Sequence, residues 1–289
     1  MNLCRFNGDR LGLVEGDTVF DVSSALSEIA QPAWPYPPGD PLFIHLDKVL
    51  DKARRLRPSA TCQRLADVAL FSPVTAPTKI MAAPVNYRAH VADANDPAID
   101  AGVHAKSLEG VEKPTEQFGL FLKASSSLVG PSEGISLVMK ERRTDPEIEL
   151  VVVIGKGGRD IAERDAFDHV AGYALGLDTT VRGAEDRSYR KSADSYSLLG
   201  PWFTTKDAIA DPSDLTIWLD INGQRRQSSS TGLLLVKIPE LIAMASRMYA
   251  LHPGDLIYTG TPEGVSQIRS GDTLRAGGTG LGEMTVAVR

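Results

Sequence analysis

The sequence predicts an α+β fold, with a β-rich mixed sheet that forms a roll or barrel and a small domain in front of it. Short strand-like apolar runs are numerous, helical patterns are few, and the two do not alternate strictly as a doubly wound α/β fold would require. A proline-containing stretch, residues 73–78, separates the first part of the chain from the rest. The predicted domains are therefore a small α+β domain over residues 1–75 and a catalytic domain over residues 76–289.

The first domain begins with a hairpin pattern. Apolar runs at 11–14 and 18–20 flank the turn Glu15-Gly16-Asp17, which predicts two paired strands. Residues 21–29 are expected to form a short helix, with Ser23 or Ser24 as its cap. The proline-rich stretch 31–41 predicts a loop, and the apolar spacing of 45–56 predicts an amphipathic helix.

The second domain alternates buried strands with loops. Residues 91–116 are polar, contain glycine and are too long for an ordinary connection, so we expect a lid, with a surface insertion of no catalytic role as the alternative. The turn Asn222-Gly223 predicts a hairpin. The expected strands are 80–84, 118–122, 150–154, 170–177, 215–221, 256–259 and 284–288, and the expected helices are 165–169 and 239–249.

Charge and composition exclude several classes of function. The formal net charge of −6 argues against a nucleic-acid partner, which usually meets a basic surface. No apolar run approaches the roughly 20 residues that span a bilayer, and the N-terminus lacks a signal-peptide pattern. The two cysteines, Cys4 and Cys62, form neither a metal motif nor a disulfide framework, so a cytoplasmic location is expected.

Two glutamates stand two positions apart at the start of a predicted strand. Side chains at such spacing project to the same face, so the carboxylates of Glu147 and Glu149 would repel each other unless one is protonated or a cation lies between them. Hard oxygen donors suit Mg²⁺, Mn²⁺ or Ca²⁺ better than zinc. An isolated pair of this kind is more often a solvated strand edge.

An aspartate ends the next predicted strand. Asp178 follows the apolar run 170–177, and an acid there is costly unless it is paired or bound to a metal. Arg182 could pair with it structurally, or could bind a substrate carboxylate through two hydrogen bonds. Taken alone, the structural ion pair is the more frequent arrangement.

Together these motifs resemble the fumarylacetoacetate hydrolase superfamily over roughly residues 79–272, and the first 75 residues resemble its smaller N-terminal domain. Single motifs of this kind occur by chance, but eight in one order are very unlikely to coincide. They are Asn86-Tyr87-Arg88-x-His90, Phe121-x-Lys123, Glu147-x-Glu149-Leu150, Gly172-Tyr173 with Asp178-x-x-x-Arg182, Lys191-Ser192-x-Asp194, Gly200-Pro201, Asn222-Gly223 with Gln227, and Pro253-Gly254-Asp255 with Thr259-Gly260-Thr261-Pro262.

The resemblance implies a homodimer with a Mg²⁺ or Mn²⁺ site, Ca²⁺ being a further possibility, and no organic cofactor. The implied metal ligands are Glu147, Glu149 and Asp178. The implied substrate is a small anionic 2-oxo or diketo acid, and its expected contacts are Tyr87, Lys123, Arg182, Gln227 and Thr261. The implied catalytic residues are His90, Lys191 and a lid acid, for which Glu116 is the first candidate and Glu112 and Glu109 follow.

The implied reaction is hydrolysis of a C–C bond in an acylpyruvate-like β-diketo acid through a metal-stabilised enolate. Hydrolysis needs a base to deprotonate water, and His90 suits that task near neutral pH. A decarboxylase or an isomerase (tautomerase) of a 2-oxo dicarboxylic acid would use the same enolate, and is the alternative. A catalytically inactive binding homologue is a third hypothesis, which the intact acidic residues argue against.

Overall fold

The computed structural model describes residues 1–90 and 111–289. Its N-terminal part contains β1 (Asn2–Phe6), β2 (Arg10–Glu15), β3 (Thr18–Asp21), β4 (Cys62–Arg64), β5 (Leu70–Phe71) and the helices α1 (Pro41–Ile44) and α2 (Leu46–Leu56). The remainder contains the strands β6 (Ile80–Ala82), β7 (Phe121–Lys123), β8 (Leu128–Val129), β9 (Thr144–Asp145), β10 (Ile148–Ile154), β11 (Val170–Asp178), β12 (Thr180–Val181), β13 (Ser197–Thr205), β14 (Thr216–Ile221), β15 (Gln224–Ser230), β16 (Leu256–Tyr258), β17 (Thr273–Gly278) and β18 (Gly282–Ala287), and the helices α4 (Pro114–Phe118), α5 (Arg187–Lys191) and α6 (Ile238–Met248).

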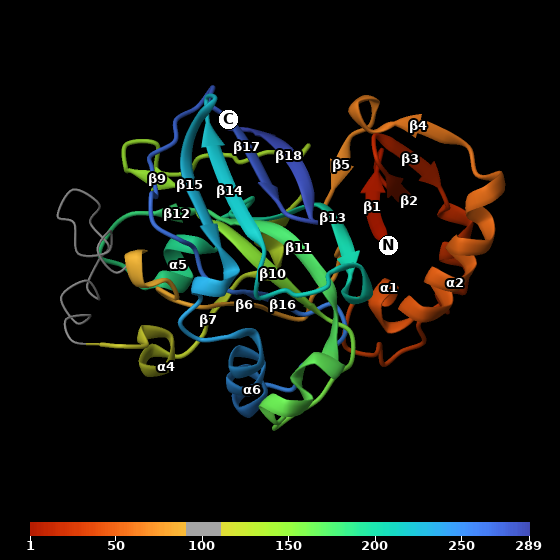
Figure 1. Ribbon diagram of the computed structural model, residues 1–289, viewed down its shortest axis with the longest axis horizontal. Helices are drawn as coiled ribbons and strands as arrows, with labels where there is room; N and C mark the ends of the chain where they lie inside the picture. Colours follow the sequence, from red (N-terminus) through yellow and green to blue (C-terminus); the bar gives the residue numbers. More distant parts are fainter. Residues whose placement is uncertain (91–110) are drawn as a thin grey trace.

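A mixed sheet of 12 strands forms the centre of this α+β fold (Figure 1). Its main order is β4-β3-β2-β1-β13-β11-β10-β16-β6-β7, with β5 on β1 and β8 on β13. Most pairs are antiparallel, whereas β16–β6 and β13–β8 are parallel. Within the described residues the order begins at β4 and ends at β7, so the sheet curls without closing into a barrel.

The N-terminal hairpin and the amphipathic helix α2 agree with the sequence prediction, and α2 buries one side while it exposes the other. The expected serine cap of the short helix is wrong. A 3-10 helix covers Ser23–Glu28, its N-cap is Val22, and no side chain caps it. The Ser23 hydroxyl instead donates to the carboxylate of Asp21, because an aspartate two residues away offers a stronger acceptor.

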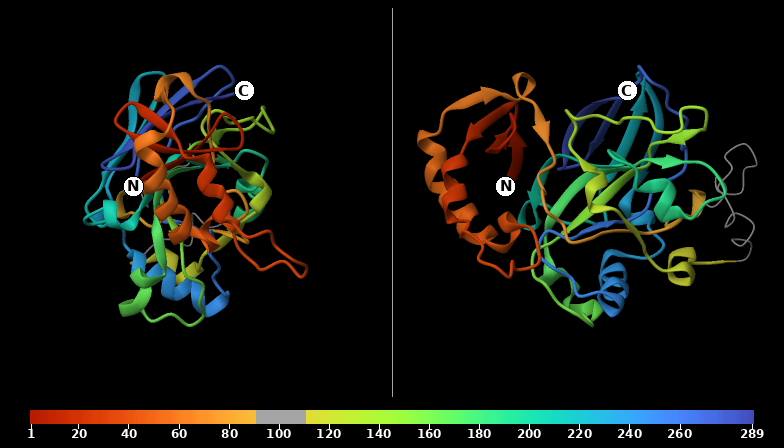
Figure 2. Two further views of the ribbon diagram at one scale, coloured as in Figure 1. Left: turned by 90° about the vertical axis from the view of Figure 1, so that its right-hand side faces the viewer. Right: turned by 180° about the vertical axis from the view of Figure 1, so that it is seen from behind.

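The N-terminal strands belong to the same sheet as the strands of the second domain. β1 pairs with β13 through Asn2–Thr204 and Leu3–Phe203, and Figure 2 shows the two parts in direct contact. One apolar cluster includes Leu3 and Val49 from the first part together with Val151 from β10. The boundary near residue 75 remains a prediction, but it does not separate two cores.

The strands β10, β11 and β13 form the buried middle of the sheet. Every residue of β10 is buried, as expected from its continuous apolar run. β10 and β11 are antiparallel, with Ile148 opposite Leu177 and Glu149 opposite Gly176. This register places the start of β10 beside the end of β11, so the acids at those two positions come together.

The segment before β7 differs from the prediction. The strand expected over 118–122 begins only at Phe121, and α4 precedes it, with Pro114 at its first position, where a missing N–H costs nothing. Residues 91–110 of the expected lid lie outside the described residues. The C-terminal sheet β15-β14-β17-β18 includes the predicted Asn222-Gly223 hairpin, whose φ angles of 51° and 78° are those of a type I′ turn.

Candidate metal centre

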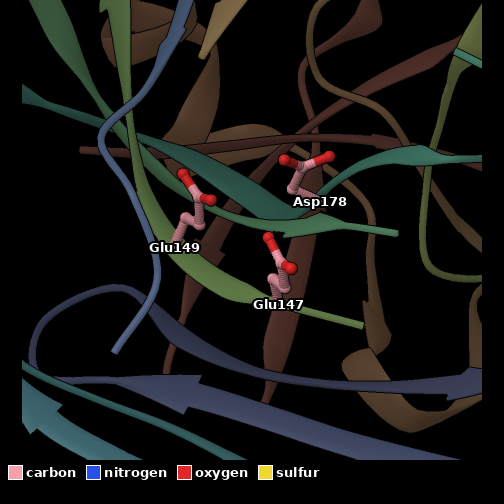
Figure 3. A group of neighbouring side chains, drawn as sticks. All are labelled: Glu147, Glu149 and Asp178. Atoms are coloured by element: carbon pink, nitrogen blue, oxygen red, sulfur yellow. The ribbon is translucent and has the colours of Figure 1, made fainter. Parts of the chain in front are cut away.

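The three predicted metal ligands meet in one buried cluster. Glu147 directly precedes β10, Glu149 is the second residue of that strand, and Asp178 is the last residue of β11 (Figure 3). Each offers a carboxylate oxygen, and these oxygens all lie within 4.8 Å of one another. The exposed fractions are 4%, 1% and 1%, so water cannot screen the repulsion between them.

The neighbouring positive charges compensate this repulsion at Glu147 more than at Glu149. Burial, and then the neighbouring carboxylates Asp178 and Glu147, raise the pKa of Glu149 well above its usual value. Burial would also raise the pKa of Glu147, but Lys191 and Arg182 outweigh it and lower that pKa. Glu149 accepts a hydrogen bond of 2.6 Å from the N–H of Gly260. The cluster therefore favours a proton, or a cation, at Glu149.

Two buried lysines point into the same cluster. Lys191 donates to Glu147 at 2.7 Å and to Asp178 at 2.6 Å. Lys123 donates to Asp178 and, at 2.7 Å, to the carbonyl oxygen of Tyr196. Burial lowers the pKa of Lys123. Both residues were expected at the site, and both contact the carboxylates that the sequence assigns to the metal.

The donor set fits Mg²⁺ or Mn²⁺. Three carboxylates supply hard oxygen donors from adjacent strands, and the raised pKa of Glu149 marks a position where positive charge is missing. A divalent cation would compensate the carboxylates that two lysines compensate only in part. Asp178 and Glu147 are held in place by lysine hydrogen bonds, which orient groups next to a metal.

Arg182 lies at the edge of the cluster, and its predicted contact with the substrate stays a prediction. It does not pair with Asp178; it donates to Asp145 at 2.8 Å and to Glu147 at 2.9 Å. Burial would lower its pKa, but the two carboxylates raise it. Asp145 is fully buried and also binds Arg143 at 2.8 Å. The sequence analysis missed Asp145, although its spacing before Glu147 and Glu149 repeats the same period of two.

Gln227 and Thr261 stabilise the start of β10. Gln227 donates to Thr261 at 2.9 Å and accepts from the N–H of Ile148 at 3.0 Å, while Thr261 donates to the carbonyl oxygen of Ile148 at 2.9 Å. Ile148 lies between the two glutamates. These bonds fix the backbone that presents both carboxylates, and a substrate contact of either residue stays a prediction.

Tyr87 and His90 lie on the segment after β6. Tyr87 is 1% exposed, and its hydroxyl has no hydrogen-bond partner among the residues that the structure describes. Burial, and then the charge of Glu149, raise its pKa, so the hydroxyl stays protonated and can donate to an acceptor. His90 is 7% exposed and lies close enough to Glu147 to influence the pKa of that carboxyl. Both residues therefore lie near the cluster, and their roles in binding and catalysis stay predictions.

Glu116 lies away from the acidic cluster. It is on α4, where Lys113 donates to it at 2.8 Å and also donates to Glu240 of α6 at 2.8 Å. It lines an open depression of about 630 Å³ together with Met244 and Met248. α4 places this side chain beside Lys113, which also binds Glu240 of α6, and a role of Glu116 beside His90 stays a prediction. Glu112 is exposed, and Glu109 lies outside the described residues.

The chain belongs to the fumarylacetoacetate hydrolase family. The family described as Fumarylacetoacetate (FAA) hydrolase C-terminal matches residues 79–289, which contain all the residues of the cluster.

None of the helices in the described residues is long and apolar enough to cross a membrane.

Within this family, the chain is similar to several proteins whose activities are named. The chain is 47% identical to a maleylpyruvate hydrolase of Aquipseudomonas alcaligenes, over 100% of this chain and 99% of that protein. A crystal structure of maleylpyruvate hydrolase from Sphingobium sp. SYK-6, in complex with manganese(II) and pyruvate, is 37% identical and covers 100% of this chain and 98% of that one, with a TM-score of 0.81. A mitochondrial oxaloacetate tautomerase of Bos taurus is 37% identical over 71% of this chain and 62% of that protein.

Proposed function

We propose that the chain is a Mg²⁺- or Mn²⁺-dependent hydrolase that cleaves a C–C bond in a small acylpyruvate-like diketo acid. The observation that supports it most is the buried carboxylate cluster in a chain that resembles a maleylpyruvate hydrolase along its whole length. The manganese and pyruvate in the related crystal structure match the donor set of this cluster and the 2-oxo acid class.

Glu147, Glu149 and Asp178 would hold the cation. A divalent cation supplies Lewis acidity to the oxygens of a bound oxo acid. Lys191 and Lys123 keep Asp178 and Glu147 in place, and the protonated Tyr87 hydroxyl can donate to a substrate oxygen. His90, near Glu147, would take the proton from water, which the hydrolytic reaction needs and a tautomerase does not.

Tautomerisation of a 2-oxo dicarboxylic acid is the second candidate. The identity of 37% with an oxaloacetate tautomerase of Bos taurus supports it. Product analysis separates the two reactions. Hydrolysis releases pyruvate from an acylpyruvate, whereas tautomerisation leaves the carbon skeleton intact.

The test uses Glu149→Gln, with Glu163→Gln as a control on an exposed 3-10 helix. In the presence of Mn²⁺, wild type and Glu163→Gln should remove the absorbance of the acylpyruvate enol and should gain melting temperature. Glu149→Gln should lose both effects, with activity down by more than about 100-fold, since even groups behind a metal ligand cost 10- to 100-fold. Equal Mn²⁺ stabilisation of all three proteins would disprove the metal assignment.

A homodimer belongs to the same proposal, because the resemblance to the family implies it, and the cytoplasmic location expected from the cysteines and the N-terminus is proposed with it. Light scattering coupled to size-exclusion chromatography measures the mass directly. A monomeric mass near 31.1 kDa would contradict the dimer.

A further inference from the structure

Arg187 on α5 is the cation whose surroundings the proposed chemistry leaves unexplained. Other cations around the cluster bind acids or backbone carbonyls, namely Lys123, Lys191, Arg182, Arg143, Arg142 and Arg190. Among the described residues, the Arg187 guanidinium makes no hydrogen bond and no ion pair. Its contact is the ring of Phe118, whose centroid lies 5.3 Å from the guanidinium carbon.

The helix α5 sets where Arg187 lies relative to the metal centre. Arg187 and Lys191 are four residues apart, so they lie on one face of the helix, separated by about one turn, or roughly 5.4 Å. Lys191 contacts the carboxylates, and its ammonium lies 5.6 Å from the ring of Phe121. The two cations therefore lie along the segment from Phe118 to Phe121. Arg187 lies about one helical turn farther from the carboxylates than Lys191 does.

The charge of Arg187 is poorly compensated. Burial lowers its pKa, and the neighbouring Arg190 lowers it further, against the attraction of Asp186 and Glu147. Asp186 is occupied, because its carboxylate accepts the N–H of Ser188 and caps the helix. A half-buried guanidinium with unused donors favours an anion, and a carboxylate matches its geometry.

We propose that Arg187 is a specificity residue, which binds the second carboxylate of a substrate that has a carboxylate at each end. The inference rests on the proposed function, because it adds a second anchor to the same acid. Arg182 is less suited to this task, since Asp145 and Glu147 already compensate its charge. Specificity would then depend on α5, while the cluster binds the oxo acid end.

Calorimetric titration of the Mn²⁺-loaded protein tests this with two ligands of equal chain length. 2-Oxoglutarate has the second carboxylate and 2-oxopentanoate lacks it. Wild type should bind 2-oxoglutarate about 10- to 100-fold more tightly, the range of a charged hydrogen-bonded pair. Arg187→Gln should bring this ratio close to one and leave the affinity for 2-oxopentanoate unchanged.

Arg5→Gln is the matched control. Arg5 also lies over a phenylalanine, at 5.2 Å from the ring of Phe71, but in the N-terminal part of the chain. Arg5→Gln should keep the wild-type preference for 2-oxoglutarate over 2-oxopentanoate, and Arg187→Lys should keep part of this preference. A ratio unchanged in Arg187→Gln would overturn the proposal, and so would equal losses for both ligands, which indicate a structural role.

The outcome is independent of the hydrolase assignment, because binding needs no turnover. A protein that prefers 2-oxoglutarate through Arg187 but leaves an acylpyruvate intact would confirm this inference and contradict the hydrolysis. A protein that cleaves acylpyruvates equally well with and without a distal carboxylate, and binds 2-oxoglutarate and 2-oxopentanoate with equal affinity, would confirm the hydrolysis. It would contradict the role of Arg187.

Discussion

The ion pair between Arg182 and Asp145 supports the metal centre from behind. Asp145 is fully buried and accepts hydrogen bonds from two guanidinium groups, and Arg182 links it to Glu147. Removing one partner of a buried pair leaves an uncompensated charge, which costs far more than the pair itself contributes. Arg182 therefore matters for the position of Glu147 as well as for the local charge.

Arg182→Lys should destabilise the protein. An ammonium cannot span two carboxylates as the planar guanidinium does, and a loss of about 2–3 kcal/mol would lower the Tm of a chain of this size by about 5–10 °C. Arg143→Lys, at a side chain that is 26% exposed, should cost less than half of that. Thermal denaturation of both variants measures the difference. An unchanged Tm with a strongly raised KM would instead support the substrate-binding role predicted from the sequence.

Sequence spacing predicts which carboxylates lie together at the site, but it does not predict which side chains form ion pairs with them. The period of two along a strand brings Glu147 and Glu149 to one face whatever the fold around them. The partner of Arg182 depends on the pairing of β9 with β12, through Asp145 opposite Thr180, and no local pattern encodes this register. Glu116 shows the same limit, because one short helix, α4, decides which way it points.

The turn after β16 connects the fold to the site. Gly260 has a φ of 102°, and a Cβ there would lie 2.6 Å from the Cβ of Asn86. Its N–H donates to Glu149. The turn thus needs a glycine for its conformation and for its close approach to the segment after β6.

Gly260→Ala should lower both the Tm and the affinity for Mn²⁺. The strained turn must move, and Glu149 then loses its backbone donor. Gly223→Ala is the control, since Gly223 has a φ of 78° but a Cβ added there would meet no atom within 4 Å. It should lower stability by about 1 kcal/mol without changing the metal affinity. Titration with Mn²⁺ at a temperature where both variants are folded compares them; equal affinities would rule out a role for the Gly260 N–H.

Apolar runs predict strands well where they are uninterrupted. β10 and β11 follow from such runs, whereas β13, nine buried residues long, was missed. Gly200-Pro201 lies in its middle, and proline is rare in central strands because it cannot donate to the ladder. β13 tolerates it because pairing with β11 shifts its register between Tyr173 and Leu175.

At the scale of the whole molecule, strands of the two predicted domains belong to one sheet. β1 covers the edge of β13, and the N-terminal ammonium donates to Thr205 at 2.6 Å. The aromatic rings of Phe43 in α1 and Phe203 in β13 pack edge to face at 5.0 Å. Residues on both sides of the boundary near 75 therefore bury the same apolar surface.

Deleting residues 1–75 should prevent the remainder from folding as a stable, soluble protein. The deletion would expose Leu199 and Phe203 together with the hydrogen-bonding edge of β13, which is a surface prone to aggregation. The intact chain should show one unfolding transition in calorimetry. Two separate transitions, or a soluble 76–289 fragment that binds Mn²⁺, would show that the second domain is independent.

The pairing of β1 with β13 also fixes an order of events during synthesis. Asn2 pairs with Thr204, so β1 must wait for a partner that the ribosome delivers about 10–40 s later, at usual elongation rates. Until then β2 covers one side of β1, and on the other side β5 covers only Arg5 and Phe6, so the edge at Asn2 and Leu3 stays open. The nascent chain therefore has an open strand edge for most of its translation, when chaperones can bind it and neighbouring nascent chains can pair with it.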